Sequence, residues 1–377
     1  MDFGLSEEQE LLQRSAREFL TQECPPAFVR EMYNDKDGFS RALHEKMAGV
    51  GWTGLLLPEA YGGLGLGMLD MAALLEEIGR AVVPGPFLFS SVLAALALKL
   101  GGTVAQKKSW LPRLASGEVI GTLALLEAND RLDAAGITLT AKKSRTGYTL
   151  AGSKMFVPFA AVADFLVVAA RTSGRSEAGV SILLVERKAP GLMIKPLEVF
   201  DQTRRVYAVE FKNVVVAKTA LIGAEGQGWK VLTRLIDAAC VALAADSLGG
   251  AQKALEMAVD YSKIRTQFER PIASFQALKH LAAEMVSEVE PARALVWYAA
   301  HVFDTRPRET PRAASLAKSR LSEVYTRTTN RAVQMHGGIG FTWEHDLHFW
   351  FKRAKWNEVA FGDATFHRER IAQIEKF

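Results

Sequence analysis

Cysteine is scarce in this sequence, and histidine occurs without the spacing that metal sites require. The two cysteines among 377 residues, Cys24 and Cys240, are far apart and form no C-x-x-C pair. This excludes a disulfide scaffold and a cysteine-rich metal site, and it fits a reducing compartment such as the cytoplasm. His345 and His348 are three residues apart, but no H-E-x-x-H motif occurs and no third ligand is indicated. We therefore expect no metal site.

An excess of charge of one sign is also absent. The chain has 46 lysines and arginines against 42 aspartates and glutamates, a net charge of +4, and no basic tract with interleaved aromatic residues. We therefore expect no nucleic-acid partner. The G-x-S-x-G and G-x-x-x-x-G-K-[ST] motifs are missing as well, which removes the main support for a nucleophile-elbow hydrolase or a nucleoside triphosphatase.

Long hydrophobic runs are limited to one uncharged stretch. It comprises the 18 residues between Arg80 and Lys99, a length that approaches that of a membrane span. Pro84–Pro86 interrupts it, and the remaining Phe87–Leu98 is too short to cross a bilayer, so we expect a buried helix and no membrane segment. The acidic start, Met1–Glu8, does not resemble a secretory signal.

The sequence does have enough apolar residues for a sizeable core. Hydrophobic residues make up 49% of it and charged residues 23%, which excludes wholesale disorder. Residues 1–116 mostly show helical spacing, residues 117–222 contain short runs of β-branched and aromatic residues, and helical spacing returns over residues 223–377. In Val206–Val216 large apolar residues alternate with smaller or polar ones, as in a strand with one buried face. The sequence therefore predicts a helical, a β and a second helical domain.

Two motifs of the C-terminal region each have two interpretations. His336–Phe341 follows a helix that ends near Met335, and its glycines either cap that helix or bring backbone N–H groups close to an anionic diphosphate. Arg265–Phe268 lies near the end of another helix, where the arginine either favours the helix dipole or pairs with a phosphate or carboxylate. The residues alone leave both interpretations open.

One carboxylate stands out in an apolar segment. Asp246 lies within Val241–Gly250, among small apolar residues of a predicted helix. A carboxylate is costly there unless it is paired or functional. Asp246 is therefore either a structural hydrogen-bond acceptor or a base in a dry pocket that abstracts a proton.

Together with several other motifs, these segments resemble the acyl-CoA dehydrogenase family along essentially the whole chain. Each motif is modest alone, but their common order and spacing are highly specific. The motifs are Phe3–Glu8, Leu57–Gly65, Ile222–Trp229, Arg265–Phe268 with Pro271–Ile272 and Phe275–Gln276, Gln334–Phe341, and Gly362–Ala364. The resemblance implies an α+β multidomain fold with an N-terminal helical domain, a central β-barrel-like domain and a C-terminal four-helix bundle.

The resemblance implies a flavoprotein that oxidises an acyl-CoA thioester to the 2,3-enoyl-CoA. In this family a carboxylate takes the α-proton, the flavin of FAD takes the β-hydride, and electron-transferring flavoprotein reoxidises the flavin. Members usually form tetramers in which a neighbouring subunit supplies part of the FAD site, so Arg265 would reach the FAD diphosphate across the subunit interface. The other FAD-binding positions implied by the matching motifs are Gln267, Phe268, Gln276, Gln334, Gly337, Gly338 and Asp363.

The sequence departs from the family in the β domain. The usual T-E-P-x-x-G-S-D stretch is replaced by Leu125–Asp133, which has lost the proline, glycine and serine. The tryptophan and threonine that flank the flavin ring align with Phe156 and Pro158. Pro158 has no N–H and no hydroxyl, so that hydrogen bond to the flavin cannot form, whereas Phe156 can still pack against the ring.

The catalytic carboxylate is the largest departure. The usual glutamate aligns with Phe361 and the site of some branched-chain members with Ala239, and neither residue acts as a base. A third site, a glutamate of a bacterial subgroup that resembles enzymes of steroid and dicarboxylate catabolism, aligns with Asp246. The resemblance thus implies Asp246 as the base, with Asp237 and Ala239 at substrate-binding positions.

Two hypotheses follow from the resemblance. In the first, the chain is an active acyl-CoA dehydrogenase that uses Asp246 and forms a homotetramer. In the second, it is a non-catalytic or half-site subunit of a heterotetramer with a dissimilar acyl-CoA dehydrogenase chain, because the subgroup often assembles in that way. Phe361 and the altered Leu125–Asp133 stretch motivate the second hypothesis.

Overall fold

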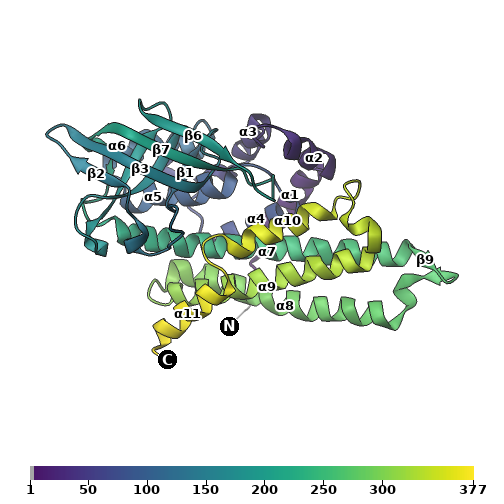
Figure 1. The fold of residues 1–377 in the computed structure, drawn as a ribbon. Helices are drawn as coiled ribbons and strands as arrows, with labels where there is room; N and C mark the ends of the chain where they lie inside the picture. The colour runs from purple at the N-terminus through teal and green to yellow at the C-terminus, as the bar shows by residue number, and fades with distance from the viewer. Residues whose placement is uncertain (1–3) are drawn as a thin grey trace. The chain divides into compact units, whose positions relative to one another are not determined.

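The computed structural model describes residues 4–377, which form the helices and strands drawn in Figure 1. The first helices are α1 (Glu7–Glu23), α2 (Pro26–Asn34), α3 (Arg41–Gly49), α4 (Met68–Arg80), α5 (Ala95–Gly101) and α6 (Val104–Ala115). The strands that follow are β1 (Gly121–Ala124), β2 (Thr140–Lys143), β3 (Gly147–Pro158), β4 (Phe165–Arg171), β5 (Val180–Glu186), β6 (Leu192–Leu197), β7 (Val206–Ala217) and β8 (Leu221–Ile222). The last elements are α7 (Gly228–Ile264), β9 (Thr266–Gln267), β10 (Arg270–Pro271), α8 (Gln276–Thr305), α9 (Thr310–His336), α10 (Leu347–Val359) and α11 (Ala364–Glu375).

The predicted order of helices, strands and helices is confirmed. Strands begin after α6, and helices return after β8. By its internal contacts the chain divides into two compact units. The helical unit contains residues 4–33, 68–83 and 240–377, and the sheet unit contains residues 34–67 and 84–239. α1 and α4 therefore belong with the C-terminal helices, while the division into three domains stays a prediction.

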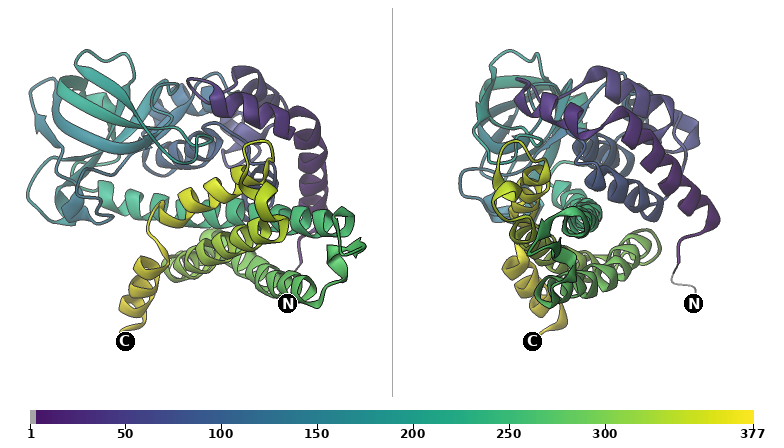
Figure 2. Two further views of the ribbon diagram at one scale, coloured as in Figure 1. Left: turned by 45° about the vertical axis from the view of Figure 1, so that its right-hand side comes forward. Right: turned by 90° about the vertical axis from the view of Figure 1, so that its right-hand side faces the viewer.

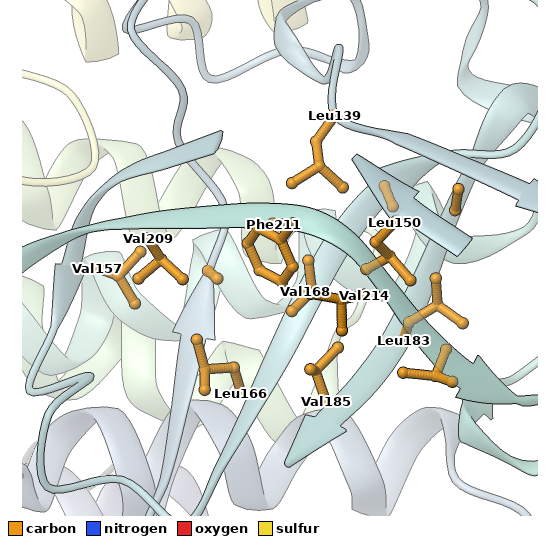
Figure 3. Packing of buried hydrophobic residues seen from close by; sticks show 14 of the residues in the cluster. Leu139, Leu150, Val157, Leu166, Val168, Leu183, Val185, Val209, Phe211 and Val214 are labelled. Atoms are coloured by element: carbon orange, nitrogen blue, oxygen red, sulfur yellow. The ribbon is translucent and has the colours of Figure 1, made fainter. Parts of the chain in front are cut away.

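The sheet unit is built on one eight-stranded sheet. Its strand order is β6-β7-β3-β2-β4-β5-β8, and β1 pairs in parallel with β4. The predicted alternation in β7 is confirmed, because Tyr207, Val209 and Phe211 are buried, whereas Ala208, Glu210 and Lys212 are less so. Figure 3 shows Val209 and Phe211 packed with residues of other strands of the sheet, among them Leu150 on β3 and Val168 on β4. The alternating pattern therefore identifies the face on which this unit builds its core.

The predicted buried helix before residue 99 belongs to the sheet unit. Every residue of Phe87–Leu98 is buried, as expected. The local geometry differs from a plain α-helix, because Leu88–Ala94 forms a π-helix that continues into α5. Within residues 4–377, no helix has both the length and the apolar character needed to cross a membrane.

The helical unit is organised around long helices that lie side by side. α9 packs against α8, α10 and α11, and α4 packs against α1 and α8 (Figures 1 and 2). Two glycines allow an unusually close crossing of α4 and α7. A Cβ on Gly79 would lie 1.9 Å from the carbonyl oxygen of Asp246, and one on Gly249 would lie 1.7 Å from that of Glu76. Any larger side chain at either glycine would force the two helices apart.

Candidate functional site

Asp246 lies on α7 and is completely buried. Its carboxylate accepts hydrogen bonds from Nη1 of Arg353 at 3.1 Å and from Nδ2 of Asn357 at 2.7 Å. The contact with Arg353 is also an ion pair. Both partners belong to α10 and are themselves buried, and Nη2 of Arg353 donates to the carbonyl oxygen of Val83 just after α4. Asp246 and Arg353 thus connect α7, α10 and the end of α4.

Sequence reasoning identified Asp246 but missed both of its partners. Arg353 and Asn357 are four residues apart, so they lie on the same face of α10. The same face of α10 also carries the apolar residues Phe349 and Trp350. A cation and an amide on an apolar helix face were the signal that could have indicated a buried partner for Asp246. The Asp246 carboxylate can thus hold these helices together, and its role as a base stays a prediction.

The loop at Phe361 and Gly362 is fixed by the helical unit. Both residues have left-handed backbone conformations, with φ of 57° and 94°. The buried ammonium of Lys318, on α9, donates to the carbonyl oxygen of Gly362 at 2.8 Å. The carboxylate of Asp363 accepts from the backbone N–H of Phe366 at 2.8 Å and caps α11. Asp363 therefore has a structural role, and its predicted contact with FAD stays a prediction.

A second buried side chain holds the same loop. Nε2 of His367 lies 3.0 Å from the carbonyl oxygen of Phe361, and Nδ1 lies 3.2 Å from the hydroxyl of Ser315. A carbonyl oxygen only accepts, so Nε2 carries the proton and Nδ1 accepts from Ser315. The thiol of Cys240 lies 3.7 Å from Nε2. His367 is therefore placed as a neutral imidazole.

Below neutral pH, His367 is expected to make the protein less stable. Burial, reinforced by the positive charges of Lys318 and Arg370, lowers the pKa of His367 to about 3. Between pH 3 and 6.5 the unfolded chain binds a proton that the folded chain does not, so stability falls with falling pH by up to about 1.4 kcal/mol per unit from this residue. His367→Gln should flatten the pH dependence of thermal unfolding, whereas the exposed His280→Gln should not. An unchanged slope in His367→Gln would contradict this assignment.

The Arg265 motif forms an exposed hairpin of the helical unit. β9 and β10 pair in antiparallel fashion directly after α7, and Arg265, Gln267, Phe268 and Gln276 are all exposed. Phe268 is 84% exposed, and its ring edge faces Phe275 at 6.0 Å. The guanidinium of Arg265 makes no ion pair with any residue that the structure describes. The hairpin thus presents a cation and an apolar ring that the chain itself does not cover.

The glycine motif lies at the same end of the helical unit. His336, the last residue of α9, stacks on Tyr261 near the end of α7, with ring centroids 4.5 Å apart. The N–H of Gly337 donates to the carbonyl oxygen of Gln334, so the capping interpretation is correct for this glycine. Gln334, Gly337 and Gly338 are exposed, and a Cβ on either glycine would meet nothing within 4 Å. The turn leaves open space at its surface.

The predicted flavin-facing residues of the sheet unit differ in exposure. Phe156 is 46% exposed and has a left-handed backbone with φ of 54°. Pro158 is buried, and its carbonyl oxygen accepts from the hydroxyl of Thr122 at 2.5 Å. Asp237 and Ala239, the predicted substrate-binding positions, lie on α7 and are buried. Of these four residues, Phe156 is the one that offers a surface to a ligand.

The two histidines that are three residues apart pack against rings. His345 lies edge-on to His336 with centroids 4.7 Å apart, and His348 stacks on Trp343 at 4.6 Å. In the part of the chain that the structure describes, no group of three or more histidine, cysteine, aspartate or glutamate side chains is placed to hold a metal ion.

The exposed residues fit the chemical needs of FAD. A diphosphate requires cations and N–H donors, and an isoalloxazine ring requires an apolar surface. Arg265 supplies an uncommitted guanidinium, the Gly337–Gly338 turn leaves space for close approach to the backbone, and Phe156 supplies an exposed ring. Arg265 and the Gly337–Gly338 turn of the helical unit would hold a diphosphate. Phe156 of the sheet unit would separately offer its ring to an isoalloxazine, which supplies a hydride acceptor when it is bound.

Family models match nearly the whole chain. The acyl-CoA dehydrogenase N-terminal domain matches residues 6–118, the middle domain residues 122–214, and the C-terminal domain residues 226–375.

Similar proteins match over almost their full length. Acryloyl-CoA reductase (NADH) of Anaerotignum propionicum is 33% identical, over 99% of this chain and 95% of that protein. A chain in a solved structure of the electron-transferring flavoprotein of Acidaminococcus fermentans has a TM-score of 0.92 and 32% identity, with 99% of each chain covered. A chain of the ChsE4–ChsE5 complex from Mycobacterium tuberculosis has a TM-score of 0.91 and 29% identity, with 100% of this chain and 99% of that chain covered.

Proposed function

Because the chain belongs to the acyl-CoA dehydrogenase family of oxidoreductases, we propose that it oxidises an acyl-CoA thioester to the 2,3-enoyl-CoA with FAD and passes the electrons to electron-transferring flavoprotein. The observation that carries the proposal is that two features lie at the same end of the helical unit. One is Arg265, which makes no ion pair with a described residue, and the other is the open Gly337–Gly338 turn. This pairing supports a diphosphate site, which FAD needs.

Each step of the proposed reaction has a residue of this chain assigned to it. The guanidinium of Arg265 would hold a diphosphate across the subunit interface, and the ring of Phe156 would pack on an isoalloxazine. Asp246 would take the proton from the α-carbon, and the isoalloxazine of bound FAD would supply the acceptor for the hydride of the β-carbon, which leaves the 2,3-double bond. Arg353 and Asn357 would orient the carboxylate of Asp246 through their hydrogen bonds. For Asp246 to reach the α-proton, its buried ion pair with Arg353 would have to give way to the substrate.

The same ion pair favours a second candidate function. If Asp246 stays paired with Arg353 in the acyl-CoA complex, the chain has no base at any of the three positions that the family uses. It would then act as a half-site or non-catalytic subunit that completes FAD sites together with a dissimilar acyl-CoA dehydrogenase chain. The similar chain in the ChsE4–ChsE5 complex supports an assembly of this kind.

The proposed reaction is tested by adding acyl-CoAs anaerobically to the purified protein reconstituted with FAD. We expect the absorption of oxidised flavin to bleach, the enoyl-CoA to form, and electron-transferring flavoprotein to restore the absorption. A series of short linear and ring-bearing acyl groups identifies the substrate class. Flavin that no acyl-CoA bleaches would support the second function, and reduction of an enoyl-CoA by NADH without acyl-CoA oxidation would contradict the proposed direction.

A further inference from the structure

A buried ion pair in the sheet unit lies directly beside Phe156. Lys154, on β3, is completely buried, and its ammonium donates to the carboxylate of Glu127 at 2.7 Å and to the carbonyl oxygen of Leu125 at 2.9 Å. Glu127 is 5% exposed. The motif that usually occupies Leu125–Asp133 in the family is altered here, yet the chain keeps a carboxylate at this position.

Glu127 joins three segments of the sheet unit. Besides Lys154, its carboxylate accepts from the backbone N–H of Thr138 at 2.9 and 3.0 Å, from the backbone N–H of Leu139 at 2.9 Å, and from the hydroxyl of Thr138. It thus ties the segment after β1 to the start of β2 and to β3. A carboxylate with this many donors holds its neighbours in one arrangement.

The ion pair lies at an irregularity of β3. Lys154 pairs with Val209 and Val157 with Tyr207 on β7, so three steps along β3 match two steps along β7. The extra residue makes a bulge, and Phe156 within it has the left-handed φ of 54° that is rare for a bulky side chain. Such backbone persists only where its surroundings enforce it.

Two side chains at the bulge differ in their exposure to solvent. Lys154 turns inward to Glu127, while the ring of Phe156 is turned outward and 46% exposed. The backbone N–H of Met155 also donates to the carbonyl oxygen of Leu126 at 2.9 Å. The bulge is therefore held from its buried side by this hydrogen bond and by the ion pair of Lys154 with Glu127. We call this ion pair the anchor of the bulge.

We infer that Lys154 and Glu127 are positioning residues, which hold the β3 bulge so that Phe156 presents its ring to the isoalloxazine. The inference rests on the proposed FAD site. Neither residue touches the cofactor in this account, and both act through the backbone of Met155–Val157. Lys154 and Glu127 make all the contacts described above within the sheet unit.

The charge of Lys154 makes the anchor sensitive to pH. Burial, reinforced by the positive charge of Arg171 on β4, lowers the pKa of Lys154 to about 8 despite the attraction of Glu127. For Glu127, burial opposes ionisation, but the charge of Lys154 and the hydrogen bonds outweigh it and lower its pKa. Glu127 therefore stays ionised as pH rises, and the ion pair is lost when Lys154 gives up its proton.

The test compares Lys154→Met and Glu127→Gln with Lys142→Met, which removes an exposed lysine of the neighbouring strand β2. For both anchor variants we expect FAD affinity to fall by about tenfold or more and the circular dichroism of bound flavin to change, whereas Lys142→Met matches the unchanged protein. The flavin signal of the unchanged protein should also vary across pH 8, and that of Lys154→Met should not. An anchor variant with unchanged FAD affinity and flavin dichroism would overturn the inference.

A second measurement separates this inference from the proposed function. Amide hydrogen exchange of Met155–Val157 reports the bulge in the absence of any cofactor, and we expect it to accelerate in Lys154→Met and in the double variant Lys154→Met/Glu127→Gln, which leaves no unpaired charge. If the unchanged protein bound no FAD, the FAD site would be wrong, and this exchange would still decide whether the ion pair holds the bulge. Unchanged exchange in both variants would refute the positioning role.

Discussion

Replacing Asp246 with asparagine is expected to lower the rate of acyl-CoA oxidation by about 10²–10⁴-fold, the usual contribution of a general base. Asparagine has nearly the same shape, and its side-chain oxygen can still accept from Arg353, but it cannot take the α-proton. Flavin should remain bound, because the proposed FAD contacts at Arg265 and Phe156 do not involve this residue. The measurement is the rate of flavin bleaching in single turnover with saturating acyl-CoA, with flavin content recorded for each preparation.

The matched control for this experiment is Asp260→Asn. Asp260 lies on the same helix, α7, and its side chain is 74% exposed, so the substitution removes a carboxylate without disturbing packing. Its bleaching rate should equal that of the unchanged protein. If Asp246→Asn bleached at the same rate as this control, Asp246 would not be the base.

Replacing Arg353 with methionine is expected to lower the free energy of unfolding by about 3–5 kcal/mol. The substitution removes the guanidinium from the fully buried Asp246 carboxylate, while Asn357 still donates to it. An uncompensated buried charge costs far more than the ion pair itself contributes. Urea unfolding followed by helical circular dichroism measures the change.

Two further variants make this result specific. Arg312→Met breaks an ion pair with Glu375 whose side chains are 45% and 35% exposed, and it should cost no more than about 1 kcal/mol. The double variant Asp246→Leu/Arg353→Met removes both buried charges and should recover much of the lost stability. If Arg353→Met were no more destabilised than Arg312→Met, the ion pair would not hold these helices together.

Local patterns were sufficient to predict the order of helices and strands along the chain. The alternation in β7 and the helical spacing of α4 depend on residues within a few positions of each other, and the structure confirms both. The π-helix at Leu88–Ala94 was not predicted, because its composition is equally suitable for an α-helix. The grouping of α1 and α4 with the C-terminal helices depends on contacts across the whole chain, which no local pattern indicates.

The partners of the buried charges were also beyond local reasoning. Asp246 could be recognised as unusual from its apolar neighbours, but Arg353 is 107 residues further along the chain. Glu127 lies in the altered Leu125–Asp133 stretch, and its contact with Lys154 appears only when β1 and β3 are placed in one sheet. Sequence reveals the cost of burying a charge, whereas the tertiary fold determines which group offsets it.

The most direct test of the account is the amount of flavin bound by this chain when it is purified alone. We expect about one FAD per chain, because Arg265, the Gly337–Gly338 turn and Phe156 all come from this sequence. The visible absorption spectrum after incubation with FAD records this ratio. Little or no flavin after that incubation would contradict the claim that the chain builds its own FAD site. It would instead favour the second candidate function, in which a dissimilar chain completes the site.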